Sequence, residues 1–199
     1  ERALLQQRAE EIGPYLAPVD IIEPGSGDCS KISLLLRGVP PQDLDTVRYI
    51  PMDISRSAVE KAASRLLSLF PDISIHCLIG DFREALLHIP LGKDRFFCFL
   101  GSTIGNLSPE QARSFLSSIS ALMKGNDRFL LGVDMVKKRD ILEDAYNDSR
   151  GITAAFNRNI LTAVNKICSS NFEPDRFSHL ALFNEQASRV EMHLKADEP

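Results

Sequence analysis

A pair of glycines and two carboxylates have the residue types and the order expected of a nucleoside-binding site. Gly25 and Gly27 stand two residues apart, and Asp53 and Asp81 follow later in the chain. Glycines let the backbone approach a ligand closely, and a helix after such a turn offers free N–H groups. Asp53 can accept hydrogen bonds from ribose hydroxyls, Asp81 can accept one from an adenine amino group, and Phe82 offers a packing face. We expect these residues to form one ligand site.

The class of ligand depends on what the glycine turn lacks. A dinucleotide fingerprint has a third glycine three residues after the second, and here that position is Ser30. The sequence also has no Gly-Lys-Ser/Thr run of an ATP-binding loop. S-adenosylmethionine fits better, because it carries adenine, ribose and an amino-acid tail but no phosphate. The alternatives are a plain strand-to-helix turn at the glycines and a helix-capping role for Asp53.

Other chemistry finds little support in the sequence. The four histidines are scattered, without a His-Glu-x-x-His run or a Cys/His spacing, so we expect no metal site. Ser102 lacks the Gly-x-Ser-x-Gly turn that exposes an acyl-transfer nucleophile. We therefore assign no catalytic residue.

The elements that position these residues are predicted by an apolar pattern that changes period repeatedly. Strands are expected at 19–23, 47–53, 73–79, 96–100 and 128–133, with helices between them. This alternation predicts an α/β fold, a parallel sheet with helices on both faces. Such folds bind ligands at the carboxyl ends of their strands, where the glycine turn and both carboxylates lie.

Local signals predict where helices begin and end. Ser55 or Ser57 can cap the helix after the second strand, and Ser57 with Glu60 fits a capping box. Ser108 followed by proline predicts the start of another helix, and Gly125 predicts its end.

The pattern changes again after Asp134. Helices are expected at 141–146 and 152–168, followed by a hairpin of strands 178–183 and 189–194. We therefore divide the chain into a first domain, 1–135, and part of a smaller α+β lobe, 136–199.

Composition argues against nucleic-acid and membrane partners. The 199 residues are 44% hydrophobic and carry a net charge of −4, with 23 basic and 27 acidic side chains. Proteins that neutralise phosphate backbones usually have the opposite balance. The one basic cluster, 137–139, is interpreted as a solvated helix start. The chain has no apolar run long enough to span a bilayer.

The four cysteines indicate a reducing compartment. Cys29, Cys77, Cys98 and Cys168 form no Cys-x-x-Cys pair, and Cys77 and Cys98 lie in apolar strand-like segments. We interpret them as buried free thiols and expect a cytoplasmic protein. The chain shows no signal-peptide pattern and opens on Glu1 without an initiator methionine, so we expect a piece of a longer protein.

Several segments taken together resemble one enzyme family. They are 23–27 with Lys31, 51–55, 80–82, 99–107, 132–137, 146–148, 156–159 and 190–192. From about residue 13 to 194 the chain is similar to the histidine-specific S-adenosylmethionine-dependent methyltransferases, which make trimethylhistidine for ergothioneine. The resemblance implies a Rossmann-like methyltransferase core at 1–135, a substrate lobe that includes 136–199, and methylation of the α-amino group of histidine.

The resemblance also implies cofactor-binding roles for five residues. Gly25 and Lys31 would line the methionine end of S-adenosylmethionine, with Lys31 near its carboxylate. Asp53 would hold the ribose hydroxyls, and Asp81 and Phe82 would hold the adenine. Without the resemblance, Lys31 would be interpreted as a solvated lysine.

Three further residues would bind the substrate. The resemblance implies that Asn106 binds the amino-acid end of histidine, that Tyr146 binds its carboxylate, and that Met192 packs in the imidazole pocket. The alternatives are a place for Tyr146 on the core face of its helix and a core-filling role for Met192 within the lobe.

The chain departs from the family at both ends. Family members have an N-terminal segment whose tyrosines help to close the active site, and a later segment in which a glutamate and a serine contact the imidazole. This chain stops at Pro199, so we expect it to methylate little histidine by itself. A methyltransferase for another small amine and a non-catalytic cofactor-binding module are the competing hypotheses.

Overall fold

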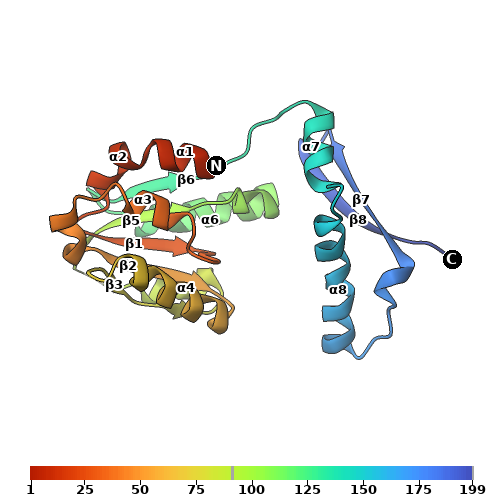
Figure 1. The fold of residues 1–199 in the computed structure, drawn as a ribbon, viewed down its shortest axis with the longest axis horizontal. Coiled ribbons are helices and arrows are strands. Elements are labelled where there is room, and N and C mark those ends of the chain that lie inside the picture. The colour runs from red at the N-terminus through yellow and green to blue at the C-terminus, as the bar shows by residue number, and fades with distance from the viewer. Residues whose placement is uncertain (91, 199) are drawn as a thin grey trace. The chain divides into compact units, whose positions relative to one another are not determined.

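A parallel sheet organises the first part of the chain (Figure 1). Its strands lie in the order β3 (Ser74–Ile75), β2 (Arg48–Asp53), β1 (Val19–Pro24), β5 (Asp94–Phe99) and β6 (Arg128–Leu131), and β4 (Leu78–Ile79) also pairs with β2. The strand order reverses between β1 and β5, which are hydrogen-bonded neighbours. Ligands of such sheets bind outside the carboxyl ends of the strands at this reversal. The α/β fold predicted from the sequence is confirmed.

The structure describes residues 1–90 and 92–198, without the side chains of Phe82 and Arg83. It is a computed structural model that divides into two compact units, Glu1–Asp134 and Met135–Pro199.

Side chains of the central strands alternate between two buried clusters, one on each face of the sheet. Ile21, Tyr49 and Phe96 join one cluster, whereas their neighbours Ile22 and Phe97 join the other. The first cluster packs against α1 (Arg2–Gln7), α3 (Ile32–Leu36) and α4 (Arg56–Leu69), and the second packs against α5 (Phe82–Ala85), η3 (Leu86–His88) and α6 (Pro109–Leu122). The sheet is therefore covered by helices on both faces.

Capping side chains set the start of the two long helices in this unit. Ser55 caps α4 by accepting a hydrogen bond from Ala58 N, so the alternative cap at Ser57 is wrong. Ser108 and Gln111 form a reciprocal capping box at the start of α6. That helix ends at Leu122, before Gly125, because Met123 already has an extended conformation.

The segment predicted as one strand at 73–79 is broken into β3 and β4. Tyr49 and Asp53 of β2 accept hydrogen bonds from His76 N and Gly80 N on this side of the sheet. Pro51, which lies between them with the same orientation, has no N–H to donate. The hydrogen-bonded ladder is therefore interrupted beside Pro51.

The remaining short helices connect these elements or precede them. They are α2 (Ala9–Ile12), η1 (Gly13–Tyr15), η2 (Pro41–Thr46) and η4 (Thr103–Asn106). Within the described residues, no helix combines the length and apolar character needed to cross a membrane. All four cysteines are free, and Cys29 and Cys98 are buried, but Cys77 is only partly buried and Cys168 is exposed. The expectation of burial was wrong for these last two.

The second unit pairs two helices with a hairpin. It contains α7 (Arg139–Tyr146), α8 (Ile152–Cys168), η5 (Pro174–Arg176), and the antiparallel strands β7 (Phe177–Asn184) and β8 (Arg189–Ala196). Asp148 accepts hydrogen bonds from Ile152 N and Thr153 N, which satisfies free N–H groups at the start of α8. Among the described residues of this unit, the buried hydrophobic ones are Leu142, Leu161 and Ala181.

Candidate functional site

The turn that leaves β1 is tied to the neighbouring strand. Gly25 N and Ser26 N donate to Met52 O of β2 at 2.8 and 3.2 Å. Gly25 and Gly27 have φ values of +67° and +56°, which glycine adopts without the strain of a side chain. The turn therefore holds a left-handed conformation that favours glycine at both positions, and it brings its backbone to the carboxyl edge of the sheet.

Asp53 lies against this turn. Its Oδ2 accepts from Gly27 N at 3.3 Å, and its Oδ1 accepts from Ser55 N at 3.0 Å. The cap of α4 is Ser55, so Asp53 is not the helix-capping residue that the sequence left as an alternative. Its carboxylate remains half-buried beside the glycine turn, where it can accept further hydrogen bonds.

Asp81 follows the strand next to Asp53. Asp53 and Ile79 are register partners of β2 and β4, and Gly80 N donates to Asp53 O at 3.1 Å. The Asp81 carbonyl accepts from Glu84 N and Ala85 N, which begins α5 directly after the strand. The two carboxylates therefore come from adjacent strand ends. The side chain of Phe82, predicted to pack on an adenine, lies outside the described part of the chain.

Lys31 reaches the end of β5 from the start of α3. Its Nζ lies 2.3 Å from the position that a Cβ atom would take at Gly101, and 3.5 Å from Glu1 Oε2. The other oxygen of Glu1 accepts from Gly101 N at 2.8 Å. An ammonium and a backbone N–H thus converge on one carboxylate, so this corner of the sheet edge is suited to bind a carboxylate group.

The segment after β5 curls back beside the glycine turn. Ser102 has a left-handed conformation with φ of +55°, and Thr103 Oγ1 donates to Leu100 O at 2.8 Å. A Cβ atom at Gly25 would lie 4.0 Å from Thr103 Cγ2. The tight turn η4 then presents Asn106 as an exposed side chain at its end.

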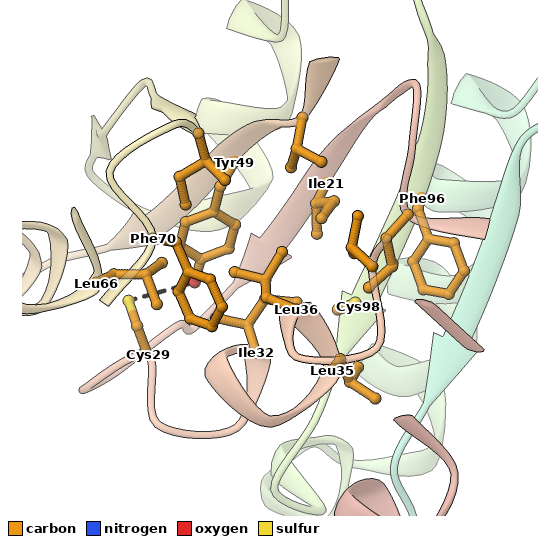
Figure 2. Close-up of a cluster of buried hydrophobic side chains, with 14 of the residues drawn as sticks. Ile21, Cys29, Ile32, Leu35, Leu36, Tyr49, Leu66, Phe70, Phe96 and Cys98 are labelled. Carbon is orange, nitrogen blue, oxygen red and sulfur yellow. Dashed lines mark hydrogen bonds between the residues drawn. The ribbon is translucent and has the colours of Figure 1, made fainter. Parts of the chain in front are cut away.

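A buried polar cluster lies beneath the glycine turn, and Figure 2 shows two of its members, Tyr49 and Cys29, within the hydrophobic core. Tyr49 Oη donates to Glu23 Oε2 at 2.5 Å and lies 3.3 Å from Cys29 Sγ. Burial raises the pKa of Glu23 to about 7, although the hydrogen bond from Tyr49 and the charge of Lys31 both act to lower it. A carboxyl group that changes charge near neutral pH therefore underlies the turn.

Tyr146 and Met192 belong to the second unit, and both side chains are 39% exposed there. This argues against the core-filling roles that the sequence left open for them. Asn147, directly after Tyr146, exchanges hydrogen bonds with the backbone of Ala181, and Ala181 is the register partner of Met192. The end of α7 and the middle of β8 are therefore connected through β7.

Comparison with known proteins shows which family the chain matches. A family model described as a histidine-specific, S-adenosylmethionine-dependent methyltransferase matches residues 1–199. The chain belongs to this family.

Two similar proteins support the assignment to the histidine-specific methyltransferases. They are the histidine N-alpha-methyltransferases of Mycobacterium tuberculosis and Mycolicibacterium smegmatis, with 36% and 39% identity over 99% and 98% of this chain. The chain spans 61% of the length of each. An O-methyltransferase family protein from Burkholderia thailandensis shares the fold, with a TM-score of 0.52 and 9% identity over 99% of this chain and 57% of that one.

Within this family member, the sheet edge brings together most of the predicted cofactor residues. Gly25 and Asp81 follow parallel strands, Asp53 is the last residue of β2, and Lys31 directly precedes α3. Glu23 and Tyr49 were missed as site residues by the sequence analysis. The available signal was an acidic residue inside an apolar strand directly before the glycine turn.

Among the described residues, no three histidine, cysteine, aspartate or glutamate side chains are grouped so that they could hold a metal ion.

Proposed function

We propose that the protein transfers methyl groups from S-adenosylmethionine to the α-amino nitrogen of histidine. The observation that carries the proposal is the convergence of the glycine turn, Asp53 and Asp81 at one edge of the sheet, in a chain that matches the histidine-specific family over its whole length. Because the chain spans 61% of its curated relatives, its activity requires a direct test.

The donor set fits S-adenosylmethionine. We assign Gly25 and Lys31 to its methionine end, because Lys31 Nζ already faces a carboxylate, that of Glu1. Asp53 would accept from the ribose hydroxyls, and Asp81 from the adenine amino group, with Phe82 as the packing face. Residues 1–135 would thus form the cofactor-binding core.

We assign three residues to the substrate. Asn106 would bind the amino-acid end of histidine, Tyr146 its carboxylate, and Met192 would pack in the imidazole pocket. Residues 136–199 would form part of the substrate lobe. The exposure of Tyr146 and Met192 leaves both side chains accessible to a ligand.

When bound, S-adenosylmethionine supplies a methyl group attached to a positively charged sulfur. An amine nitrogen can attack the carbon of this methyl group in line with its bond to sulfur. The residues of the protein need mainly to align that amine, and alignment of this kind contributes up to ~7–11 kcal/mol. An α-amine has a pKa near ~8 in model compounds, and a nearby positive charge favours its neutral form. We therefore assign no general base. Asn106 and Tyr146 would keep the substrate in place while successive methyl groups are added.

A small-molecule substrate and a cytoplasmic location are part of the proposal. The net charge of −4 argues against a nucleic-acid partner, and four free cysteines suit a reducing compartment.

Mass spectrometry of reaction mixtures tests this function in the full-length protein. Histidine and S-adenosylmethionine should give mono-, di- and trimethylhistidine with every methyl group on the α-nitrogen. Alanine and tryptophan serve as amines that lack imidazole. Methylation of another amine in preference to histidine would support the other-amine hypothesis, and cofactor binding without any product would support a non-catalytic module.

A further inference from the structure

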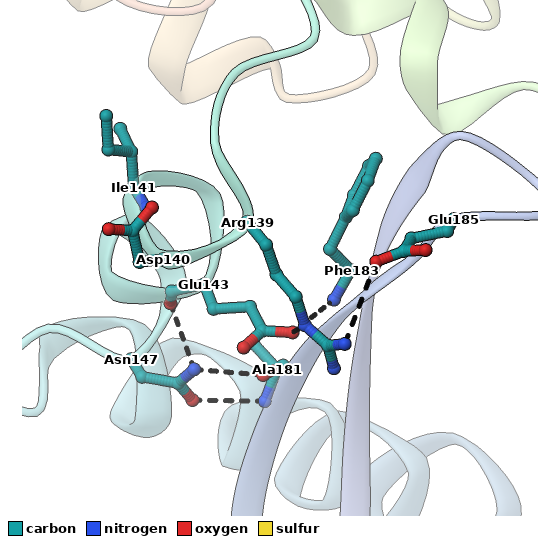
Figure 3. Close-up of polar contacts among 8 residues, drawn as sticks. All are labelled: Arg139, Asp140, Ile141, Glu143, Asn147, Ala181, Phe183 and Glu185. Carbon is teal, nitrogen blue, oxygen red and sulfur yellow. Dashed lines mark hydrogen bonds and ion pairs between the residues drawn. The ribbon is translucent and has the colours of Figure 1, made fainter.

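Asn147 makes three side-chain hydrogen bonds, two of which fasten the end of α7 to β7 and one of which lies within α7 (Figure 3). Its Oδ1 accepts from Ala181 N at 3.1 Å, and its Nδ2 donates to Ala181 O and to Glu143 O, both at 2.9 Å. Only an amide side chain can accept from an N–H and donate to two carbonyls at once. Neither aspartate nor an apolar residue can replace it without loss of these bonds.

The direction of the hydrogen bonds to Ala181 shows which type of pair this residue forms with β8. Because the N–H and C=O of Ala181 face Asn147, they do not bond to Met192, its partner in the register. Ala181 and Met192 therefore form the narrow, non-hydrogen-bonded type of antiparallel pair, in which the side chains lie closer together.

Glu143 provides a second attachment one helical turn earlier. Its Oε1 accepts from Phe183 N and from Arg139 Nε (Figure 3), and both hydrogen bonds are 2.9 Å long. Arg139 also lies 3.8 Å from Glu185. Glu143 and Asn147, four residues apart, thus bind the backbone of Phe183 and Ala181, two residues apart on β7. These contacts fix the position of α7 along the strand.

His179 of β7 holds the backbone of Tyr146 itself. Its Nε2 lies 2.8 Å from Tyr146 O, and its Nδ1 lies 3.0 Å from Asn157 Nδ2. Because Asn157 Nδ2 also donates to His193 O, it is the amide nitrogen that faces the imidazole. The Nδ1 atom of His179 must then accept, so the proton is on Nε2 and is donated to Tyr146 O.

We propose that Asn147 and His179 are positioning residues for Tyr146. They hold the last residue of α7 so that its exposed phenol can bind the carboxylate of the amino-acid substrate. This inference rests on the proposed function, because it concerns the same substrate site. Neither residue contacts the reacting atoms.

Asn165 provides a matched control. It makes the same kind of attachment at the end of α8, where its Oδ1 accepts from Phe172 N at 2.8 Å and from Ser170 Oγ at 3.0 Å, and its Nδ2 donates to Phe172 O at 2.7 Å. Asn165→Ala therefore removes three comparable hydrogen bonds without touching α7.

Steady-state kinetics separates positioning from stability. Asn147→Ala should raise the KM for histidine at least tenfold with kcat within threefold, and leave the affinity for S-adenosylmethionine unchanged. Asn165→Ala should leave this KM within twofold. In a Tyr146→Phe background, Asn147→Ala should raise the KM for histidine by less than a further factor of two. An equal increase in both backgrounds, or no increase in either, overturns the proposal.

A second pair of variants covers the case in which Asn147→Ala does not fold. His179→Phe removes both hydrogen bonds of the imidazole, whereas His179→Gln can accept from Asn157 and donate to Tyr146 O. Histidine KM should rise in the first variant and be restored in the second. Equal KM values for the two variants would exclude a positioning role for His179.

A fluorine NMR measurement makes the test independent of activity. The chain has three tyrosines, so after incorporation of fluorotyrosine the Tyr146 resonance is the one lost in Tyr146→Phe. It should move in Asn147→Ala and His179→Phe but not in Asn165→Ala. An unmoved resonance overturns the positioning role even if histidine is methylated. A moved resonance without histidine methylation supports that role and contradicts the proposed function instead.

Discussion

Tyr49 Oη of β2 donates a hydrogen bond of 2.5 Å to Glu23 Oε2 of the neighbouring strand β1, and both side chains are buried. The pairing places a titratable carboxyl beneath the glycine turn of the cofactor site. Burial raises the pKa of Glu23 from 4.5 to about 7. The folded protein therefore keeps a proton on Glu23 in a pH range where the unfolded chain has lost it.

This difference predicts that stability falls as the pH rises. The contribution of Glu23 is fully present below pH 4.5 and is lost as the pH rises through about 7, because the native state binds more protons in that interval. The change of pKa corresponds to about 3 kcal/mol. Urea unfolding at pH 5 and pH 8 should show this loss in the wild type but not in Glu23→Gln. An identical pH dependence in the two proteins would contradict the assignment.

Removing the hydroxyl of Tyr49 should destabilise the fold. Tyr49→Phe keeps the buried ring but leaves the Glu23 carboxyl without this donor, a loss that typically costs about 1–3 kcal/mol. Tyr15→Phe is the control, because Tyr15 is 49% exposed and its ring, not its hydroxyl, contacts Arg128. Thermal and urea unfolding should separate the two variants, and equal stabilities would show that the buried hydrogen bond contributes nothing.

Asp53→Ala should weaken binding of S-adenosylmethionine. Hydrogen bonds to a charged group contribute about 1.5–3 kcal/mol, and Asp53 also supports the turn through Gly27 N. Asp28→Ala is the control, since Asp28 accepts from Ser30 N in the same loop but does not end a strand. Isothermal titration calorimetry should show the loss in Asp53→Ala alone. Unchanged affinity there would remove Asp53 from the cofactor site.

Asn106→Ala should affect the substrate more than the cofactor. Asn106 is exposed at the end of η4, beyond the strand end that carries the Lys31 contact. In the full-length protein we expect histidine affinity to fall tenfold or more, in line with about 1.5 kcal/mol for a hydrogen bond to a charged ligand group. The affinity for S-adenosylmethionine should stay within twofold. If only cofactor affinity falls, the substrate role of Asn106 is wrong.

The strands and long helices were predictable because their signals are local. The apolar runs of β1, β2 and β5 and the periodic pattern of α8 predicted these elements within two residues at each end. The break between β3 and β4 was not predicted, because it depends on a proline in the neighbouring strand rather than on the segment itself. Ser57 with Glu60 fitted a capping box, but the cap is Ser55, and only the backbone shows which serine begins the helix.

The site could be predicted in part because the parallel sheet itself was predictable. Parallel strands bring their carboxyl ends to one edge, so Asp53 was expected beside the glycine turn, where the structure places it. The contacts of Glu23 with Tyr49 and of Lys31 with Glu1 join residues 26 and 30 positions apart. Both depend on side-chain packing across strands and helices, which spacing along one segment does not reveal.

The close approach of α3 to the N-terminal helices predicts the effect of a single methyl group. A Cβ atom at Gly38 would lie 1.8 Å from Ala9 O, and one at Gly13 would lie 2.0 Å from Gly38 O. Both obstacles are backbone atoms, so a side chain cannot simply rotate away. Gly38→Ala must therefore separate α2 and η1 from the end of α3, at a cost of at least about 1–3 kcal/mol.

Gly125→Ala is the control that separates the steric clash of an added methyl group from the loss of a glycine as the cause of destabilisation. Gly125 has no atom within 4 Å of an added Cβ and has no positive φ. Alanine there reduces the freedom of the unfolded chain and should be neutral or stabilising by up to about 1 kcal/mol. Melting temperatures should therefore fall in Gly38→Ala and stay level or rise in Gly125→Ala. A Gly38→Ala protein as stable as the wild type would mean that the N-terminal helices do not pack on α3 as closely as the structure shows.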